Sequence, residues 1–268
     1  MTFSKMLIVG YGTMTGAMVE GWLRAGHSRD SFEVYHPTKT EVERGLAVHN
    51  TWPEAQYDFV LLGVKPHMID DVAGGIAGVC GANTAILSVL AGVELDSLAS
   101  RFPSAGGVVR FMPNLAVAIG KSPNALMAKG IGEETRAEVT KLASDLGTAE
   151  WIEDEALFDL VTALAGSGPG FVYRFIDALA AGATRLGLPA EQAERLAVAM
   201  VDGAGSLAAG SEHSPRELAR RVASPGGMTQ KGLDVLDEGS ALQELVTECL
   251  RAARDRGREM ADSARKNG

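Results

Sequence analysis

Short apolar runs alternate with amphipathic stretches along the first half of the chain. The runs are Met6–Val9, Phe32–Tyr35, Phe59–Val64, Ala85–Leu90 and Gly107–Phe111. They lack strict polar–apolar alternation, which is typical of parallel strands covered by helices on both faces. Helical stretches such as Met14–Ala25 and Ile69–Val79 lie between them. This order predicts an α/β domain over residues 1–154, built on a doubly wound parallel sheet.

From about Glu155 the strand pattern disappears and only helical patterns remain. Predicted helices begin at Pro169, at Pro189, after a Ser214–Glu217 capping box and at Ser240. An all-helical second domain is therefore expected over residues 155–268. Its helices are rich in Ala, Gly and Leu, and a domain of this size buries little apolar surface by itself. We expect it to pack against a second subunit, in a homodimer or a higher homo-oligomer.

The composition restricts the location and the partners. The net charge of −9, from 25 basic and 34 acidic residues, argues against a nucleic-acid partner. The apolar runs are shorter than a membrane span and no basic leader precedes the first strand, so neither a membrane nor a signal peptide is expected. Cys80 and Cys249 match no metal or disulfide pattern, which favours a reducing cytoplasm. The histidines form no cluster with metal-ligand spacing, so no metal site is expected; they are His27, His36, His49, His67 and His213.

A glycine loop follows the first predicted strand and opens the first helix. In Gly10-Tyr11-Gly12-Thr13-Met14-Thr15-Gly16, Gly10 suits a tight turn and Gly12 suits a close approach of backbone to pyrophosphate. The third fingerprint position holds Thr15 instead of Gly or Ala. A purely structural strand–helix turn is the alternative, but the position at the start of an α/β half favours a Rossmann-type dinucleotide site.

The end of the second strand indicates which dinucleotide is used. NAD-binding folds usually place Asp or Glu there, whereas this chain has His36-Pro37-Thr38-Lys39. The Thr38 hydroxyl and the Lys39 ammonium fit a 2′-phosphate better than a 2′-hydroxyl. NADPH is therefore the expected cofactor, with NADH possible. In the alternative interpretation Lys39 is simply solvated.

Three other loops follow strands at the edge of such a sheet where ligands bind. They are Gly63–Pro66, Leu90–Val93 and Met112–Asn114. Lys65 is held extended by Pro66, and we expect it beside the nicotinamide ribose. Gly166–Phe171 opens the first helix of the second domain, where its glycines approach either another helix or the nicotinamide.

A second glycine turn, Ser224-Pro225-Gly226-Gly227-Met228-Thr229, lies between two helical patterns. Where such a turn opens a helix, unpaired N–H groups and the helix dipole favour an anion. Ser224 and Thr229 add hydroxyls. The alternative is a plain helix–helix connection.

These motifs together resemble the pyrroline-5-carboxylate reductase family over essentially the whole chain. The matching landmarks, in order, are Gly10-Tyr11-Gly12, Val64-Lys65-Pro66, Ser88 to Val93, Arg110 to Asn114, Gly166 to Pro169 and Ser224 to Thr229. The last of them is the most specific. The resemblance implies a Rossmann domain followed by an all-α dimerisation domain, and an NAD(P)H-dependent oxidoreductase that acts on a C=N bond in proline biosynthesis.

The resemblance also implies site residues by position. Cofactor contacts are expected from Val9, Gly10, Tyr11, Gly12, Thr13, Met14, His36, Asn50, Gly63, Val64, Lys65, Pro66, Leu90, Ala91 and Gly92. Substrate contacts are expected from Glu212, Ser224, Gly226, Gly227, Met228 and Thr229. The Thr229 hydroxyl would hydrogen-bond the ring nitrogen, and backbone N–H groups of the turn would bind the ring carboxylate.

The chain departs from the family pattern at three places. Leu115-Ala116 follows Asn114 where the family has Thr-Pro, Thr15 replaces a small residue, and the stretch from Pro37 to Asn50 is short. A related cyclic imine is therefore an alternative substrate. The same domain order would also suit a β-hydroxyacid dehydrogenase-like enzyme or a non-catalytic NADPH-binding protein.

Overall fold

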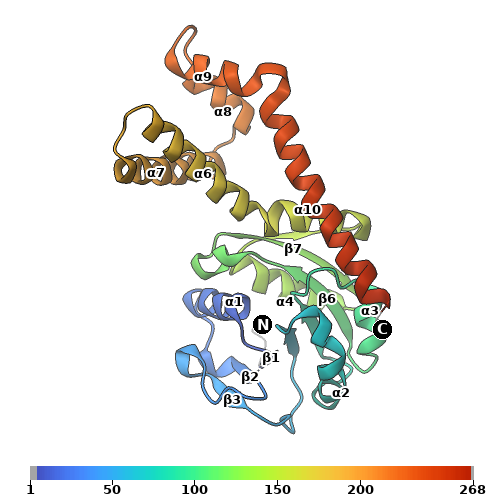
Figure 1. Cartoon of the computed structure of the whole chain (residues 1–268). Helices are drawn as coiled ribbons and strands as arrows, with labels where there is room; N and C mark the ends of the chain where they lie inside the picture. The colour runs from blue at the N-terminus through green and yellow to red at the C-terminus, as the bar shows by residue number, and fades with distance from the viewer. Residues whose placement is uncertain (1–4, 267–268) are drawn as a thin grey trace. The chain divides into compact units, whose positions relative to one another are not determined.

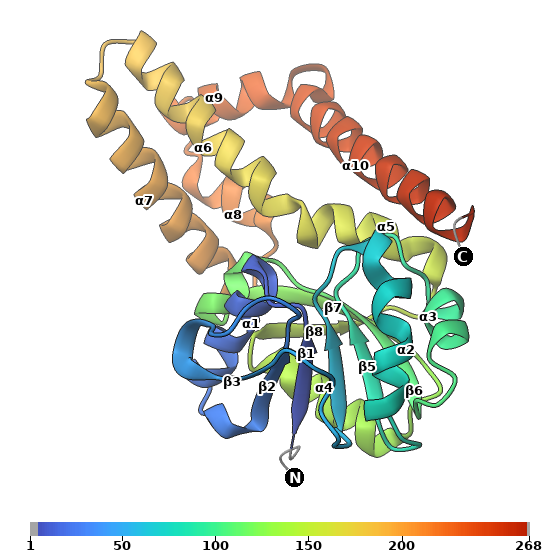
Figure 2. The ribbon, with the colours of Figure 1, turned by 60° about the horizontal axis from the view of Figure 1, so that its bottom comes forward.

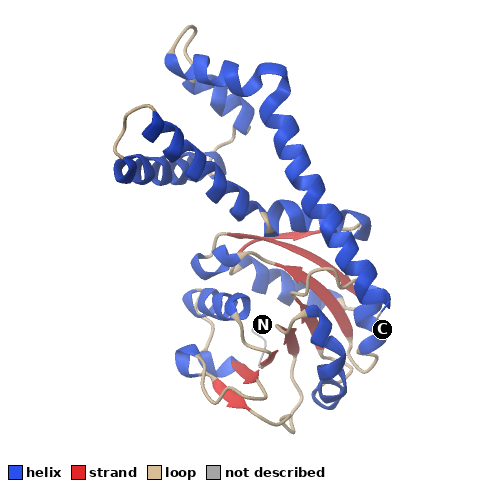
Figure 3. Cartoon of the chain, viewed as in Figure 1, coloured by secondary structure: helices blue, strands red, loops and turns tan. Residues whose placement is uncertain are grey.

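The computed structural model describes residues 5–266, which form two compact units. The first unit comprises residues up to Ser167 together with those from Ala252 onward, and the second is Gly168–Arg251. The strands of the described chain all lie in the first unit, and the second unit is helical (Figures 1 and 3). The predicted fold class, an α/β sheet followed by helices, is confirmed.

The sheet has eight strands in the order β3-β2-β1-β4-β5-β6-β7-β8. Their bounds are Met6–Val9 (β1), Phe32–Tyr35 (β2), Ala47–His49 (β3), Phe59–Leu62 (β4), Ala85–Ser88 (β5), Gly107–Met112 (β6), Ser122–Lys129 (β7) and Gly147–Trp151 (β8). Neighbouring strands pair in parallel except β6 and β7, which are antiparallel. The chain reverses its direction of winding between β1 and β4. In open α/β sheets, ligands bind outside the carboxyl ends of the strands at such a reversal.

Helices cover both faces of the sheet (Figure 2). They are α1 (Thr13–Arg24), α2 (Ile69–Val79), α3 (Leu95–Arg101) and α4 (Glu133–Ser144). Met6 and Ile8 of β1 belong to the core layer with α1 and α4, while Leu7 and Val9 belong to the layer with α2 and α3. Both layers take apolar residues from every second strand position, which explains why the strands have continuous apolar runs.

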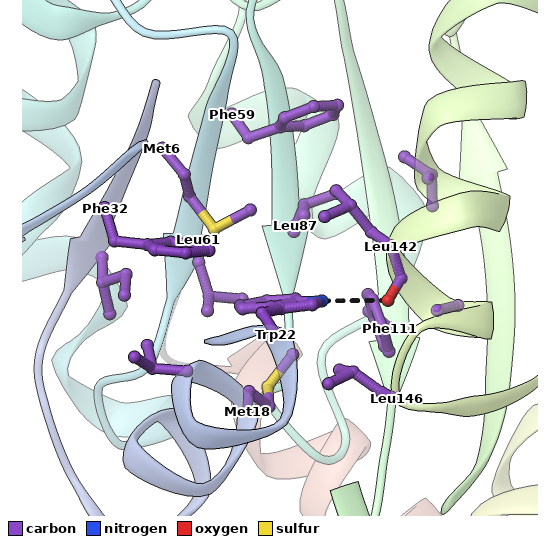
Figure 4. Packing of buried hydrophobic residues seen from close by; sticks show 14 of the residues in the cluster. Met6, Met18, Trp22, Phe32, Phe59, Leu61, Leu87, Phe111, Leu142 and Leu146 are labelled. Carbon is purple, nitrogen blue, oxygen red and sulfur yellow. Dashed lines mark hydrogen bonds between the residues drawn. The ribbon is translucent and has the colours of Figure 1, made fainter. Parts of the chain in front are cut away.

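Trp22 of α1 lies at the centre of the first core layer (Figure 4). It is fully buried and stacks on Phe32 with ring centroids 5.5 Å apart. Its indole N–H donates to the Leu142 carbonyl of α4 at 2.9 Å. The bond satisfies the one polar atom of the side chain, so α1, β2 and α4 are tied together without an unpaired buried group.

Three strands were not predicted from the apolar runs. β3 has only three residues, β7 includes Pro123 and Asn124, and β8 alternates exposed with half-buried positions. β7 also pairs antiparallel with β6. The sheet is therefore mixed, whereas the apolar runs predicted a parallel sheet. These strands lie toward the edges of the sheet. A strand there is covered on one face only, so its sequence mixes polar and apolar residues and lacks a continuous apolar run.

The short stretch after β2 forms no crossover helix. It contains a single 3₁₀ turn, Glu43–Gly45, before β3. This agrees with the short stretch from Pro37 to Asn50 in the sequence.

Residues beyond the predicted boundary at 154/155 pack on the sheet unit. Arg110 of β6 is buried and pairs with Glu155 at 3.0 Å and with Asp159 at 3.7 Å. Phe158, the first residue of α5 (Phe158–Val161), is fully buried under the Arg110 guanidinium, 3.9 Å from the ring centroid. The compact sheet unit therefore extends through the π-helical turn Thr162–Gly166 to Ser167.

The second unit contains α6 (Gly168–Arg185), α7 (Ala190–Ala209), α8 (Pro215–Val222), α9 (Met228–Asp237) and the start of α10 (Ala241–Lys266). The predicted cap of α8 is present, since Ser214 Oγ accepts the Glu217 N–H at 3.3 Å and Pro215 occupies the first turn. Pro189 caps α7 rather than lying inside it. Within the described residues, the stretch Glu155–Arg185 is long and apolar enough to cross a membrane by length and composition alone.

Candidate active site

The glycine loop connects β1 to α1 at the carboxyl edge of the sheet. Gly10 has φ +85°, and its N–H donates to the Tyr35 carbonyl at 3.0 Å. A Cβ at Gly10 would lie 2.9 Å from Val64 Cγ1 and 3.1 Å from the Val64 nitrogen. Both the backbone conformation and the space exclude a side chain here, so Gly10 permits the tight turn that the sequence predicted.

Thr15 stabilises this loop from its buried side. It is buried, and its Oγ1 accepts the Gly12 N–H at 2.9 Å and donates toward the Gly12 and Gly10 carbonyls at 3.2 and 3.4 Å. Its methyl group fills the space where a Gly63 Cβ would lie, at 2.4 Å. Thr15 therefore occupies the third fingerprint position as a support for the loop, with its side chain turned into the protein.

The first turn of α1 suits an anion. Gly12 and Thr13 are exposed, no side chain caps the helix apart from the Thr15 contact, and no acidic residue lies in the first turn. The first-turn N–H groups and the positive end of the helix dipole then favour negative charge. The residues present therefore fit a pyrophosphate.

The loop after β2 is held by His36 and Asn50. The His36 Nδ1 accepts the N–H groups of Thr38 and Lys39 at 3.3 and 3.1 Å, and burial followed by the nearby Lys39 charge lowers the pKa of His36. Asn50 Nδ2 donates to the carbonyls of His36 and Lys39 at 2.9 and 2.6 Å. Lys39 Nζ donates to the Tyr11 carbonyl at 2.9 Å, which brings this loop against the glycine loop.

The loops after β4 and β5 adjoin the same edge of the sheet. Gly63 N–H donates to the Val9 carbonyl at 2.9 Å, and Lys65 is exposed and extended with ψ 149° before Pro66, as predicted. Leu90 is buried, and Gly92 has φ +73°. A Cβ at Gly92 would lie 3.0 Å from Met260 Cβ of α10, so a close helix contact by itself explains this glycine.

Asn114 has a structural role that its motif did not indicate. Its Oδ1 accepts the Ala116 N–H at 2.8 Å, and its Nδ2 donates to the Ala165 carbonyl at 2.9 Å. Leu115, the first unusual residue after the motif, is 52% exposed. The departure at Leu115 therefore leaves the backbone turn at Asn114 intact.

The second glycine turn lies in the helical unit. Gly226 has φ +74°, and the Gly227 N–H donates to the Ser224 carbonyl at 2.9 Å. Gly227 is the N-cap of α9, which has no acidic residue in its first turn and no side-chain cap. Met228, Thr229 and Glu212 are exposed. This is the helix-opening turn, with N–H groups available to an anion, that the sequence predicted.

The predicted residues fall into two sets, one in each unit. The cofactor set, Val9–Met14, His36, Thr38, Lys39, Asn50, Gly63–Pro66 and Leu90–Gly92, belongs to the sheet unit. The substrate set, Glu212, Ser224 and Gly226–Thr229, belongs to the helical unit. Among the described residues no group of three His, Cys, Asp or Glu side chains could hold a metal. The assignment of these residues to ligands stays a prediction.

Sequence and structure comparisons identify the family. A family model described as pyrroline-5-carboxylate reductase dimerisation matches residues 155–260. The chain is 38% identical over 204 residues to the pyrroline-5-carboxylate reductase of Aquifex aeolicus, covering 76% of this chain and 75% of that protein. It is 30% identical over 270 residues to the pyrroline-5-carboxylate reductase of Pseudomonas aeruginosa, covering 98% of each. The solved structure of a pyrroline-5-carboxylate reductase from Coxiella burnetii is similar with a TM-score of 0.89 at 27% identity, covering 97% of this chain and 99% of that one. The chain belongs to the pyrroline-5-carboxylate reductase family.

Proposed function

We propose that this protein is an NAD(P)H-dependent oxidoreductase that reduces the ring C=N bond of 1-pyrroline-5-carboxylate to give L-proline. The observation that carries the proposal is the match to reductases of this name along almost the whole chain, with both glycine turns intact. The two turns supply one anion site in the sheet unit and a second in the helical unit.

The cofactor residues have distinct tasks in this proposal. Bound NADPH supplies the hydride for the ring carbon. The first turn of α1 and the glycine loop Gly10–Met14 bind its pyrophosphate, and the loop from His36 to Lys39 binds the adenosine ribose. The absence of a carboxylate after β2 supports a preference for NADPH over NADH.

The substrate residues would bind and orient a small anion. The N–H groups around Gly226 and Gly227 would take the ring carboxylate, with Ser224 and Met228 beside it and Glu212 as a further contact. The Thr229 hydroxyl would hydrogen-bond the ring nitrogen. A protonated imine needs orientation more than an acid of unusual pKa, so catalysis would come mainly from positioning.

We further propose that residues 1–154 bind the cofactor and residues 155–268 hold the dimer together. The matched dimerisation model and the exposed apolar side chains of α6 and α7 support a homo-oligomer. We infer that the protein is a soluble enzyme of the cytoplasm, since both Cys80 and Cys249 are free thiols.

The test is an assay of NADPH oxidation with 1-pyrroline-5-carboxylate, beside a panel of β-hydroxyacids assayed with NADP⁺. We expect turnover with the imine alone. Oxidation of a hydroxyacid would indicate a dehydrogenase, although the helical residues offer few lysines as proton donor, and Lys231 pairs with Asp234 at 3.6 Å. NADPH binding without turnover of any cyclic imine would indicate a non-catalytic protein.

A further inference from the structure

We propose that Arg44, oriented by Glu20, forms with Lys39 the site that selects the 2′-phosphate of NADPH. This rests on the proposed function, which supplies the dinucleotide. It adds a residue that the glycine loop and the β2 terminus did not indicate.

Arg44 reaches the cofactor edge because the β2–β3 connection is short. A 3₁₀ turn replaces a crossover helix there, and Arg44 has φ +66° within it. A side chain at positive φ is strained, and such strain persists where the surrounding structure fixes it. The turn lies beside α1 and its preceding loop, where a hollow of about 940 Å³ opens to solvent. The hollow is lined by Tyr11, Gly12, Thr13, Gly16, Ala17, Glu20, Lys39, Glu43, Arg44 and Ala118.

Glu20 holds the Arg44 guanidinium in a fixed orientation. Arg44 Nε donates to Glu20 Oε2 and Nη2 donates to Oε1, each at 2.7 Å. This two-point pairing uses one edge of the guanidinium and leaves the remaining N–H groups for another acceptor. The side chain is 57% exposed, so those groups are accessible. Glu20 is therefore a positioning residue, because it acts through Arg44.

Lys39 brings a second cation to the hollow. Its ammonium lies 5.7 Å from the centroid of the Tyr11 ring and is anchored on the Tyr11 carbonyl at 2.9 Å. Burial, and then the Glu43 and Glu20 carboxylates, raise the pKa of Tyr11 to about 12, while Arg44 opposes that shift. Tyr11, Glu20, Lys39, Glu43 and Arg44 thus line the same hollow. A planar guanidinium and an ammonium that line one hollow can both donate to a phosphate bound there.

Glu43 opposes this selection. Its carboxylate lines the same hollow and would repel a phosphate dianion. Replacement of Glu43 should therefore strengthen phosphate binding, whereas replacement of Arg44 should weaken it.

The test measures binding of 2′,5′-ADP and of 5′-AMP by titration calorimetry, two probes that differ in the 2′-phosphate. Arg44→Gly is the main variant, because glycine accepts the positive φ and preserves the turn. We expect its Kd for 2′,5′-ADP to rise about tenfold to a hundredfold, with the Kd for 5′-AMP changed less than about twofold. Glu20→Gln removes a carboxylate of the hollow but can still accept one hydrogen bond from Arg44, so its Kd for 2′,5′-ADP should change less than that of Arg44→Gly. Glu43→Gln should lower the Kd for 2′,5′-ADP. Arg29→Ala is the control, since Arg29 is 60% exposed and does not line the hollow.

The outcomes separate this inference from the proposed function. If Arg44→Gly binds 2′,5′-ADP as tightly as the wild type, or loses both probes equally, Arg44 does not select the phosphate and the inference is wrong. If the wild-type protein binds neither probe nor NADPH, the proposed function itself fails. A fall in the NADPH-to-NADH ratio of kcat/KM in Arg44→Gly, with the NADH value unchanged, would support the inference independently.

Discussion

At the scale of single residues, Gly10 and Thr15 together determine the shape of the glycine loop between β1 and α1. Gly10 provides a backbone conformation that other residues avoid, and Thr15 satisfies the Gly12 N–H from inside. The Thr15 methyl group also fills the space beside Gly63 that a side chain at Gly63 would need. An unusual residue at a fingerprint position can therefore preserve the loop, provided that its polar atom returns to the backbone.

Gly10→Ala should disrupt both the loop and cofactor binding. The new Cβ would lie 2.9 Å from Val64 Cγ1 on a backbone with φ +85°. We expect a loss of about 1–3 kcal/mol of unfolding free energy and weaker NADPH binding, measured by urea unfolding and by titration. Gly12→Ala is the comparison, because a Cβ there meets nothing within 4 Å; equal stability losses in the two variants would contradict the steric argument.

Thr229→Val keeps the shape of the side chain and removes its hydroxyl. If the hydroxyl bonds the ring nitrogen, kcat should fall about tenfold to a thousandfold with NADPH affinity nearly unchanged. Steady-state kinetics and NADPH titration provide the two readouts. Thr229→Ser is the matched control and should retain most of the activity. Wild-type turnover by the valine variant would remove Thr229 from the mechanism.

At the scale of elements, Glu33 ties together the amino-terminal part of the sheet. Its carboxylate accepts from Tyr57 Oη at 2.6 Å, from His49 Nε2 at 2.8 Å and from the Lys5 ammonium. Burial would raise the pKa of Glu33, but these three hydrogen bonds and the Lys5 charge outweigh it and lower the pKa to about 2. The carboxylate therefore connects β2 to β3 and to the segments preceding β1 and β4.

This pairing predicts a pH-dependent contribution to stability. Because the pKa in the folded protein is below the ordinary value of 4.5, the contribution is complete above pH 4.5 and is lost as the pH falls toward 2. Glu33→Gln should lower the free energy of unfolding by about 1–2 kcal/mol at pH 7. The difference from the wild type should narrow in urea titrations at pH 4 and pH 3. Glu54→Gln at an exposed position is the control, and a difference that stays constant with pH would refute the assignment.

At the scale of the whole molecule, the helical unit exposes more apolar surface than a stable monomer usually leaves in water. Tyr173 of α6 is 67% exposed, Leu207 of α7 is 74% exposed and Val235 of α9 is 68% exposed. The matched dimerisation model covers all three positions. A second copy of the chain would bury this surface, which also explains the apolar character of Glu155–Arg185 without a membrane.

Leu207→Arg should therefore weaken the assembly while leaving each protomer folded. The exposed position can accept a charge within the protomer, whereas an apolar interface cannot. Light scattering at micromolar concentration should show a smaller species, and reductase activity should fall with it. Glu194→Arg, at an exposed position on the same helix, is the control for added charge. A wild-type protein that is monomeric and fully active would contradict the dimer.

The sequence alone determined what depends on local burial and local backbone shape. The continuous apolar runs predicted β1, β2 and β4 to β6, since strands buried on both faces need no polar positions. Gly10 predicted a tight turn, and Ser214 predicted a helix cap, because both are set by neighbours close in sequence. The order of the motifs identified the family, which the relatives confirm.

Contacts between residues that are distant in the sequence depend on the tertiary structure. β7 and β8 carry mixed polar patterns, and their place in the sheet follows from pairing with β6 and with each other. Thr15 departs from the glycine-loop motif, and its contacts with Gly12 and Gly63 explain how the loop keeps its shape. No sequence pattern indicated the pairing of Arg44 with Glu20, because the two residues lie on different elements. Local patterns encode burial and turns, whereas pairing across the chain is fixed by packing.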